Sequence, residues 1–68
     1  MITVDEVKAM VAEIERVKDD DETAHSRQDD LYEIVLVEIR KGVTGPEAAA
    51  LATEALKVRE IDFARWCA

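Results

Sequence analysis

The sequence predicts an all-α fold: a single domain, residues 1–68, built from three helices over about 4–18, 21–41 and 45–65. Three observations predict it. Apolar residues recur at three- and four-residue spacing, two segments begin with a Thr-x-x-Glu capping box, and the connections between segments are short. Short connections make neighbouring helices antiparallel. A hydrophobic core of this size gives only marginal stability, so close helix packing or association must stabilise the fold.

The first helix is marked by its start and by its apolar stripe. Thr3 and Glu6 have the spacing of a capping box, in which each side chain bonds the other residue's amide. The stripe behind this cap follows helical spacing: Val4, Val7, Met10, Val11, Ile14 and Val17. The acidic run 19–22 then favours a break, with Asp20 or Asp21 capping the second helix. Since no Gly or Pro enforces that break, one long bent helix through residue 41 remains an alternative.

The chain is organised around Leu31–Ile39, in which seven of nine residues are apolar. As a helix, this run has one main apolar side: Leu31, Tyr32, Val35 and Ile39. Ile34 and Val37 lie on the flank towards the opposite face, and a helix apolar nearly all round needs cover from more than one direction. The run is therefore the central helix of a packed unit or part of a subunit interface, and we expect a homodimer through Ile34 and Val37. A strand is the rival interpretation, although the only other β-type run is 2–4.

The third helix follows a turn. Gly42 is placed to stop the second helix, and Thr44 with Glu47 repeats the capping box, with Pro46 tolerated in the first turn. The segment beyond is rich in alanine, so we expect it to pack closely against the second helix. The two helices and their turn also fit a helix-turn-helix, but the balanced charge of the third helix disfavours DNA reading.

Charge is distributed unevenly along the chain. The net charge is −7, and residues 1–33 hold eleven acids and four bases, whereas the rest is balanced. An acidic half disfavours direct nucleic-acid binding and suits solubility, a basic protein partner or imitation of nucleic acid. No segment is apolar enough to cross a membrane, and no signal pattern is present. With Cys67 as the single cysteine and no internal disulfide, we expect a cytoplasmic protein.

The single histidine allows two functional hypotheses. Glu22-x-x-His25 resembles half of a carboxylate-bridged metal site, and His25 with Asp29 has the spacing of an acid–base pair. The alternative is a structural histidine that packs on Tyr32 and pairs with a carboxylate. One histidine supplies too few ligands, so we predict no metal, no cofactor and no catalytic residue, and hence no enzyme.

Other side chains have both a structural and a functional interpretation. Phe63 and Trp66 either hold helix three on the bundle or anchor a partner, and packing is favoured. Glu38 falls on the apolar side of its helix, where it either answers a basic partner or, as we favour, reaches solvent or pairs with Lys41. Cys67 has no nearby base and is expected to be inert. The candidate partner-binding residues are Asp21, Glu22, His25, Asp29, Phe63 and Trp66.

Two stretches, DDETAHSRQDDLYEIVL and REIDFARWCA, resemble segments of small acidic proteins encoded by actinobacterial phages and prophages. The resemblance implies a phage accessory protein that acts in the host cytoplasm, and it assigns no functional residue. We therefore expect a non-enzymatic protein that binds a protein partner, such as a basic host protein, but neither nucleic acid nor a membrane. Two alternatives stay open: an acidic mimic of nucleic acid that blocks a DNA-binding protein, and a small metal-dependent enzyme that uses Glu22 and His25.

Overall fold

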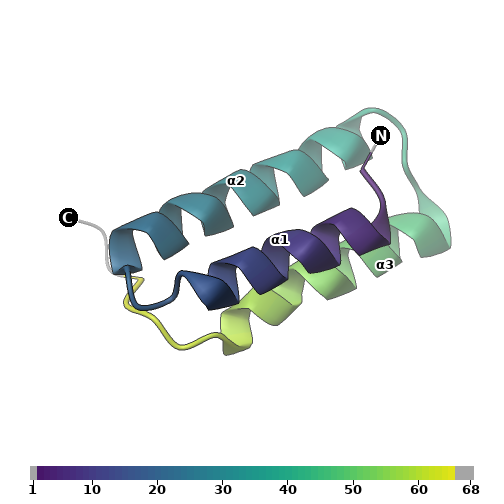
Figure 1. The fold of residues 1–68 in the computed structure, drawn as a ribbon. Coiled ribbons are helices and arrows are strands. Elements are labelled where there is room, and N and C mark those ends of the chain that lie inside the picture. The colour runs from purple at the N-terminus through teal and green to yellow at the C-terminus, as the bar shows by residue number, and fades with distance from the viewer. Residues whose placement is uncertain (1, 66–68) are drawn as a thin grey trace.

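Three α-helices pack side by side in the computed structural model, which describes residues 2–65. Helix α1 spans Val4–Arg16, α2 spans Asp21–Arg40 and α3 spans Gly45–Leu56. Helices α1 and α3 run in one direction and α2 runs in the other (Figure 1), and each helix contacts the other two. The described residues contain no strand, so the all-α prediction is confirmed and the strand interpretation of the apolar run is wrong.

The first two helices begin at the predicted caps. The Thr3 hydroxyl accepts from the Glu6 amide at 3.1 Å, and the Glu6 carboxylate accepts from the Thr3 amide at 3.2 Å. At the start of α2, Asp20 Oδ1 accepts from the Thr23 amide at 3.1 Å, so α1 and α2 are separate helices. Each of these caps pairs an amide that the helix itself leaves without a partner.

The turn into α3 departs from the expected capping box. Gly42 adopts a φ of +116°, which ends α2 as predicted. Thr44 occupies the cap position of α3, but its hydroxyl makes no capping bond. The physical reason is the next residue: Gly45 has a left-handed φ of +61°, which turns the chain away from the geometry in which a threonine hydroxyl reaches the Glu47 amide. The Thr44–Glu47 capping box is therefore wrong.

The core lies between the three helices. Every element contributes to it, and its residues in chain order are Ile2, Val7, Ile14, Ala24, Leu31, Val35, Leu51, Ala55, Val58, Ile61 and Phe63. Helix α3 packs on α1 as well as on α2, which was the only neighbour expected for its alanine-rich segment. Tyr32 is half-buried against this core.

Only one stripe of α2 is buried. It consists of Ala24, Leu31, Val35 and Glu38. Ile39, which the helical wheel placed with Leu31 and Val35, is instead 38% exposed, as is Ile34. Helix α2 is thus one of three neighbours and not a central helix covered on all sides, because α1 and α3 both approach it from the same side. The buried Glu38 carboxylate lies 3.7 Å from the Lys41 ammonium, which confirms their predicted pairing.

Helix α3 ends nine residues before the predicted limit of residue 65. The 3-10 helix η1, Lys57–Glu60, follows it, and the chain from Ile61 to Arg65 is irregular. Leu51, Ala55 and Val58 are buried at helical spacing, and a continued helix would place position 62 on the same buried side. That position is an aspartate, and it is exposed. The chain instead unwinds and buries Ile61 and Phe63, whose separation of two fits an extended backbone.

This C-terminal segment is tied back onto α2. The Ala64 amide donates to Asp21 Oδ1 at 3.2 Å, and Arg65 Nε donates to Gln28 Oε1 at 2.9 Å. Arg65 Nη2 also donates to the carbonyls of Val58 and Ile61 at 2.7 and 2.8 Å. The Arg65 guanidinium therefore holds the end of η1 and stacks over the Phe63 ring, 3.8 Å from its centre. Within residues 2–65, no helix has both the length and the apolar character needed to cross a membrane.

Candidate protein interaction surface

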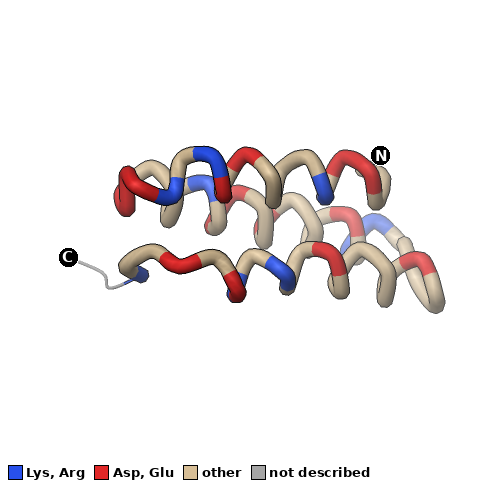
Figure 2. Tube along the Cα trace, turned by 60° about the horizontal axis from the view of Figure 1, so that its bottom comes forward, with Lys and Arg blue, Asp and Glu red and all other residues tan. Residues whose placement is uncertain are grey.

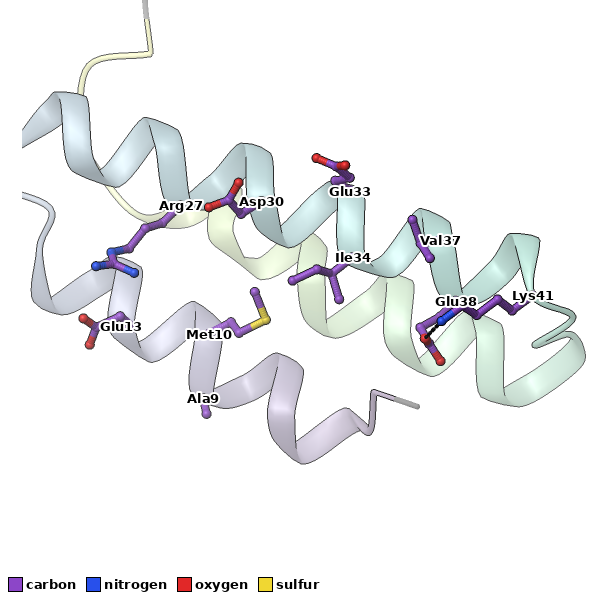
Figure 3. Close-up of a pocket in the computed structure, with 10 residues that line it drawn as sticks. All are labelled: Ala9, Met10, Glu13, Arg27, Asp30, Glu33, Ile34, Val37, Glu38 and Lys41. Carbon is purple, nitrogen blue, oxygen red and sulfur yellow. Dashed lines mark ion pairs between the residues drawn. The ribbon is translucent and has the colours of Figure 1, made fainter.

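A groove of about 720 Å³ runs between α1 and α2 on the surface of the bundle. We call it the α1–α2 groove. Ten residues line it: Ala9, Met10, Glu13, Arg27, Asp30, Glu33, Ile34, Val37, Glu38 and Lys41 (Figure 3). Seven of the ten belong to α2 and the turn that follows it, so this helix supplies most of the surface.

The middle of the groove is apolar. Ile34 is 38% exposed, and Val37 and Met10 are half-buried. Ile34 and Val37 stand three residues apart, on a face of α2 that the buried stripe through Leu31 and Val35 does not include. The fold therefore leaves an apolar surface there because α1 borders this face of α2 without covering it.

Charged residues mark both ends of the groove. At one end, Arg16 donates two hydrogen bonds to Glu13, and Arg27 reaches across from α2 (Figure 3). The hydrogen bonds from Arg16, helped by the nearby charges of Arg16 and Arg27, lower the pKa of the Glu13 carboxyl. At the other end lies the pair of Glu38 and Lys41. Each end thus holds both signs of charge around an apolar middle.

A second, shallower hollow lies on the outer side of α2. Its volume is about 480 Å³, and it is lined by Asp29, Tyr32, Glu33, Leu36, Val37 and Arg40. Leu36 is 64% exposed, the largest exposure among the large apolar side chains described. Val37 and Glu33 belong to both hollows, so the exposed apolar surface of α2 continues from one to the other.

Four consecutive acidic residues lie at one end of the bundle. The run from Asp19 to Glu22 lies where α1 turns into α2 (Figure 2), and all four residues are exposed. Asp20 is engaged in capping α2, and the bonds from the Thr23 amide and hydroxyl lower the pKa of its carboxyl. Asp21 accepts from the Ala64 amide, so it holds the C-terminal segment. Only part of this cluster is therefore free to meet a partner.

The structure does not assemble the metal or acid–base sites considered from the sequence. His25 Nε2 lies 3.7 Å from Asp29 Oδ1, too far for a hydrogen bond, and the Asp29 side chain is largely exposed. Within the part of the chain that the structure describes, no three His, Cys, Asp or Glu residues stand close enough together to hold a metal ion. His25 is half-buried near the start of α2, and Glu22 is exposed.

The six candidate partner-binding residues fall into three groups. Asp21, Glu22, His25 and Asp29 lie in the first half of α2 and do not line the α1–α2 groove. Phe63 belongs to the core, so its packing interpretation holds and it is not available to a partner. Trp66 and Cys67 lie outside the described residues. Sequence reasoning overlooked Arg27, Asp30 and Met10 as groove residues, although the spacing of positions 27, 30, 34, 37 and 41 was a signal.

Comparison with known proteins does not place the chain in a family. No protein-family model matches the chain, and neither the curated proteins nor the solved structures contain a match to it. The function must therefore be inferred from the surface itself.

Proposed function

We propose that this chain is a non-enzymatic interaction protein that binds another protein through the α1–α2 groove. One observation carries the proposal: Ile34, Val37 and Met10 form an apolar strip on the surface of a strongly charged molecule. Apolar strips rimmed by charges are typical of protein-binding surfaces, because the strip supplies affinity and the rim supplies orientation.

The apolar strip is partly exposed to water, so a partner that covers it gains the free energy of burying that surface. Ile34 and Val37 are aliphatic side chains whose full burial contributes roughly 1.5–3 kcal/mol each. The folded chain recovers only part of this contribution, since Ile34 is 38% exposed and Val37 is half-buried. A partner that covers both side chains recovers the remainder, and Met10 can adjust its shape to the partner because its side chain is unbranched.

The shape of the groove selects the partner's structure. A channel between two helices accepts a third helix, whose apolar face then meets the strip. We consider two sources of that helix: a second copy, which gives a homodimer through Ile34 and Val37, and a basic protein of the host. The resemblance to phage proteins supports an accessory role in the host cytoplasm, where such a protein would meet its partner.

Site-specific photo-cross-linking in the source cells tests the proposal. A benzophenone amino acid at Val37 lies in the groove, whereas the same group at Thr53 lies exposed on α3. We expect a discrete covalent product from position 37 that is absent from position 53 and is lost when Ile34→Lys is added. No product at position 37, or the same products from both positions, would overturn the proposal.

A second candidate function follows from the acidic surface. Glu22, Asp29 and Glu33 are exposed and recur at spacings of seven and four, which places them along one side of α2. Such a row of carboxylates suits imitation of a phosphate backbone that occupies a DNA-binding protein. A competition assay tests whether the chain inhibits the binding of duplex DNA by a DNA-binding protein. Inhibition should fall steeply as the salt concentration rises, and inhibition that is insensitive to salt would exclude imitation of nucleic acid.

A further inference from the structure

Four of the seven residues on the α2 side of the groove follow one another at regular helical spacing. Asp30, Ile34, Val37 and Lys41 follow one another at spacings of four, three and four, which is the spacing of a helix–helix seam. Figure 3 shows them spaced along the length of the helix. The order of their chemistry is acid, apolar, apolar, base.

This order is complementary to itself when one copy is reversed. In an antiparallel pair of α2 helices with the two-fold axis between positions 35 and 36, Asp30 of each copy lies opposite Lys41 of the other. Ile34 of each copy then lies opposite Val37 of the other, so the apolar pairs occupy the centre. The two ion pairs flank that centre, and the separation of 11 positions from Asp30 to Lys41 corresponds to about 16 Å along the helix.

The neighbouring charges agree with the same direction. Glu33 and Arg40 are exposed on the side of the seam, and reversal brings Glu33 of one copy near Arg40 of the other. A parallel pair would instead place Asp30, Glu33 and Lys41 each against its own copy, which opposes like charges at all three positions. Arg27 does not disturb the antiparallel pair, because it faces Glu13 within its own chain.

The surface requirement is modest for a chain of this size. Specific interfaces bury roughly 600–800 Å² on each partner at the small end of the range. That is about an eighth to a sixth of the 4656 Å² surface of the chain, so the interface has to extend from the groove over the neighbouring exposed faces of α1 and α2. Buried area does not determine affinity, so the dimer has to be sought over a wide range of protein concentration.

We propose that the α1–α2 groove receives α2 of a second copy in antiparallel orientation, with Asp30 of each copy facing Lys41 of the other. This inference rests on the proposed function, since it names the protein that the same groove binds. The resulting dimer places four helices side by side, α1 and α2 of each copy, with the apolar strip enclosed between them.

Sedimentation of the full purified chain between about 1 and 200 µM tests the dimer. We expect a concentration-dependent species of twice the 7.6 kDa chain mass. Asp30→Lys and Lys41→Asp each place like charges opposite one another, and each should weaken dimerisation roughly tenfold or more. The double variant Asp30→Lys/Lys41→Asp restores opposite charges and should recover the original constant to within about threefold.

Two further variants locate the seam. Ile34→Lys should abolish the dimer, whereas Leu36→Lys, on the same helix but outside the seam, should leave it within about threefold of the original. Lys41→Asp also breaks the pair with the buried Glu38 within the chain, so circular dichroism and urea unfolding check that this variant and the others stay folded. A chain that sediments as a monomer throughout, single charge variants without effect, or loss of the dimer with Leu36→Lys alone would each overturn the antiparallel pair.

The cross-linking experiment keeps the two proposals apart. A monomer in sedimentation combined with a position-37 product of another mass would overturn the homodimer and leave the proposed function standing. A product of twice the chain mass supports both.

Discussion

Leu31 and Leu36 lie in the same helix with opposite surroundings, so replacing each by alanine isolates the effect of burial. Leu31 is 0% exposed within the core, whereas Leu36 is 64% exposed. Both changes exchange the same residues in the interior of α2, so the difference in helix propensity cancels between them. We expect Leu31→Ala to lower the free energy of unfolding by roughly 2–5 kcal/mol through lost contacts and the cavity left behind.

The change at Leu36 should be much smaller. About a third of that side chain is covered, so the expected loss is below about 1 kcal/mol. A domain of 68 residues has a free energy of unfolding of roughly 3–10 kcal/mol, so Leu31→Ala could remove most of it. For that reason Leu31→Val and Leu36→Val form a second, milder pair.

The assay is urea unfolding followed by circular dichroism at a single low protein concentration, below the dissociation constant of the proposed dimer. The midpoint of Leu31→Ala should fall well below that of Leu36→Ala, with the valine pair in the same order. Equal losses at the two positions, or a larger loss at Leu36, would refute the arrangement in which α2 turns Leu31 inward and Leu36 outward.

Three further outcomes follow from the caps and the C-terminal segment. Arg65→Met removes the guanidinium that bonds the Val58 and Ile61 carbonyls, and should cost roughly 1.5–3 kcal/mol in urea unfolding and speed hydrogen exchange at the Ala64 amide. Gly42→Ala meets no neighbouring atom but must adopt a φ of +116°, so calorimetry should show a loss of about 1–2 kcal/mol that comes from the backbone alone. The pKa of Asp20 is lowered by its bonds to Thr23, so the stability that its carboxylate contributes is present at neutral pH and is lost as the pH falls from 3.8 through the lowered value. Asp20→Asn cannot titrate and should lose less stability across that window; identical acid profiles would contradict the role of the cap.

The first two helices could be predicted closely because local signals decided them. The Thr3 and Glu6 side chains bond each other's amides at the start of α1, and Asp20 caps α2 through a residue three positions away. These interactions depend on sequence neighbours alone. The predicted limits of α1 and α2 therefore differ from the observed ones only at their C-terminal ends, by one or two residues.

The end of α3 could not be predicted in this way, because tertiary contacts decide it. Local composition allows a helix to residue 65, yet Ile61 and Phe63 reach the core only if the chain unwinds. The bonds from Arg65 to Gln28 and from Ala64 to Asp21 join residues 37 and 43 positions apart. The spacing of residues within a single helix does not reveal contacts between residues so far apart in the sequence.

The candidate surface was predicted in part. Helical spacing correctly placed Ile34 and Val37 away from the buried side of Leu31, whereas their cover by a second subunit stays a prediction. Helical spacing within α2 does not show which of its faces α1 and α3 leave exposed. Ile39 was therefore wrongly placed on the buried side, and Arg27, Asp30 and Met10 were overlooked as groove residues. The acids that drew attention in the sequence, Asp20 and Asp21, serve largely to hold the fold.

The position of Arg65 near the end of the described chain has a consequence for biosynthesis. Because translation runs from the N-terminus, α1 and α2 leave the ribosome before the residues that close the hydrophobic interior against them. Ile61 and Phe63 are among the last described residues to be made, and the guanidinium that fastens them comes later still. Helix α3 can cover most of the first helical hairpin earlier, so only the part of the core that Ile61 and Phe63 complete depends on these last residues.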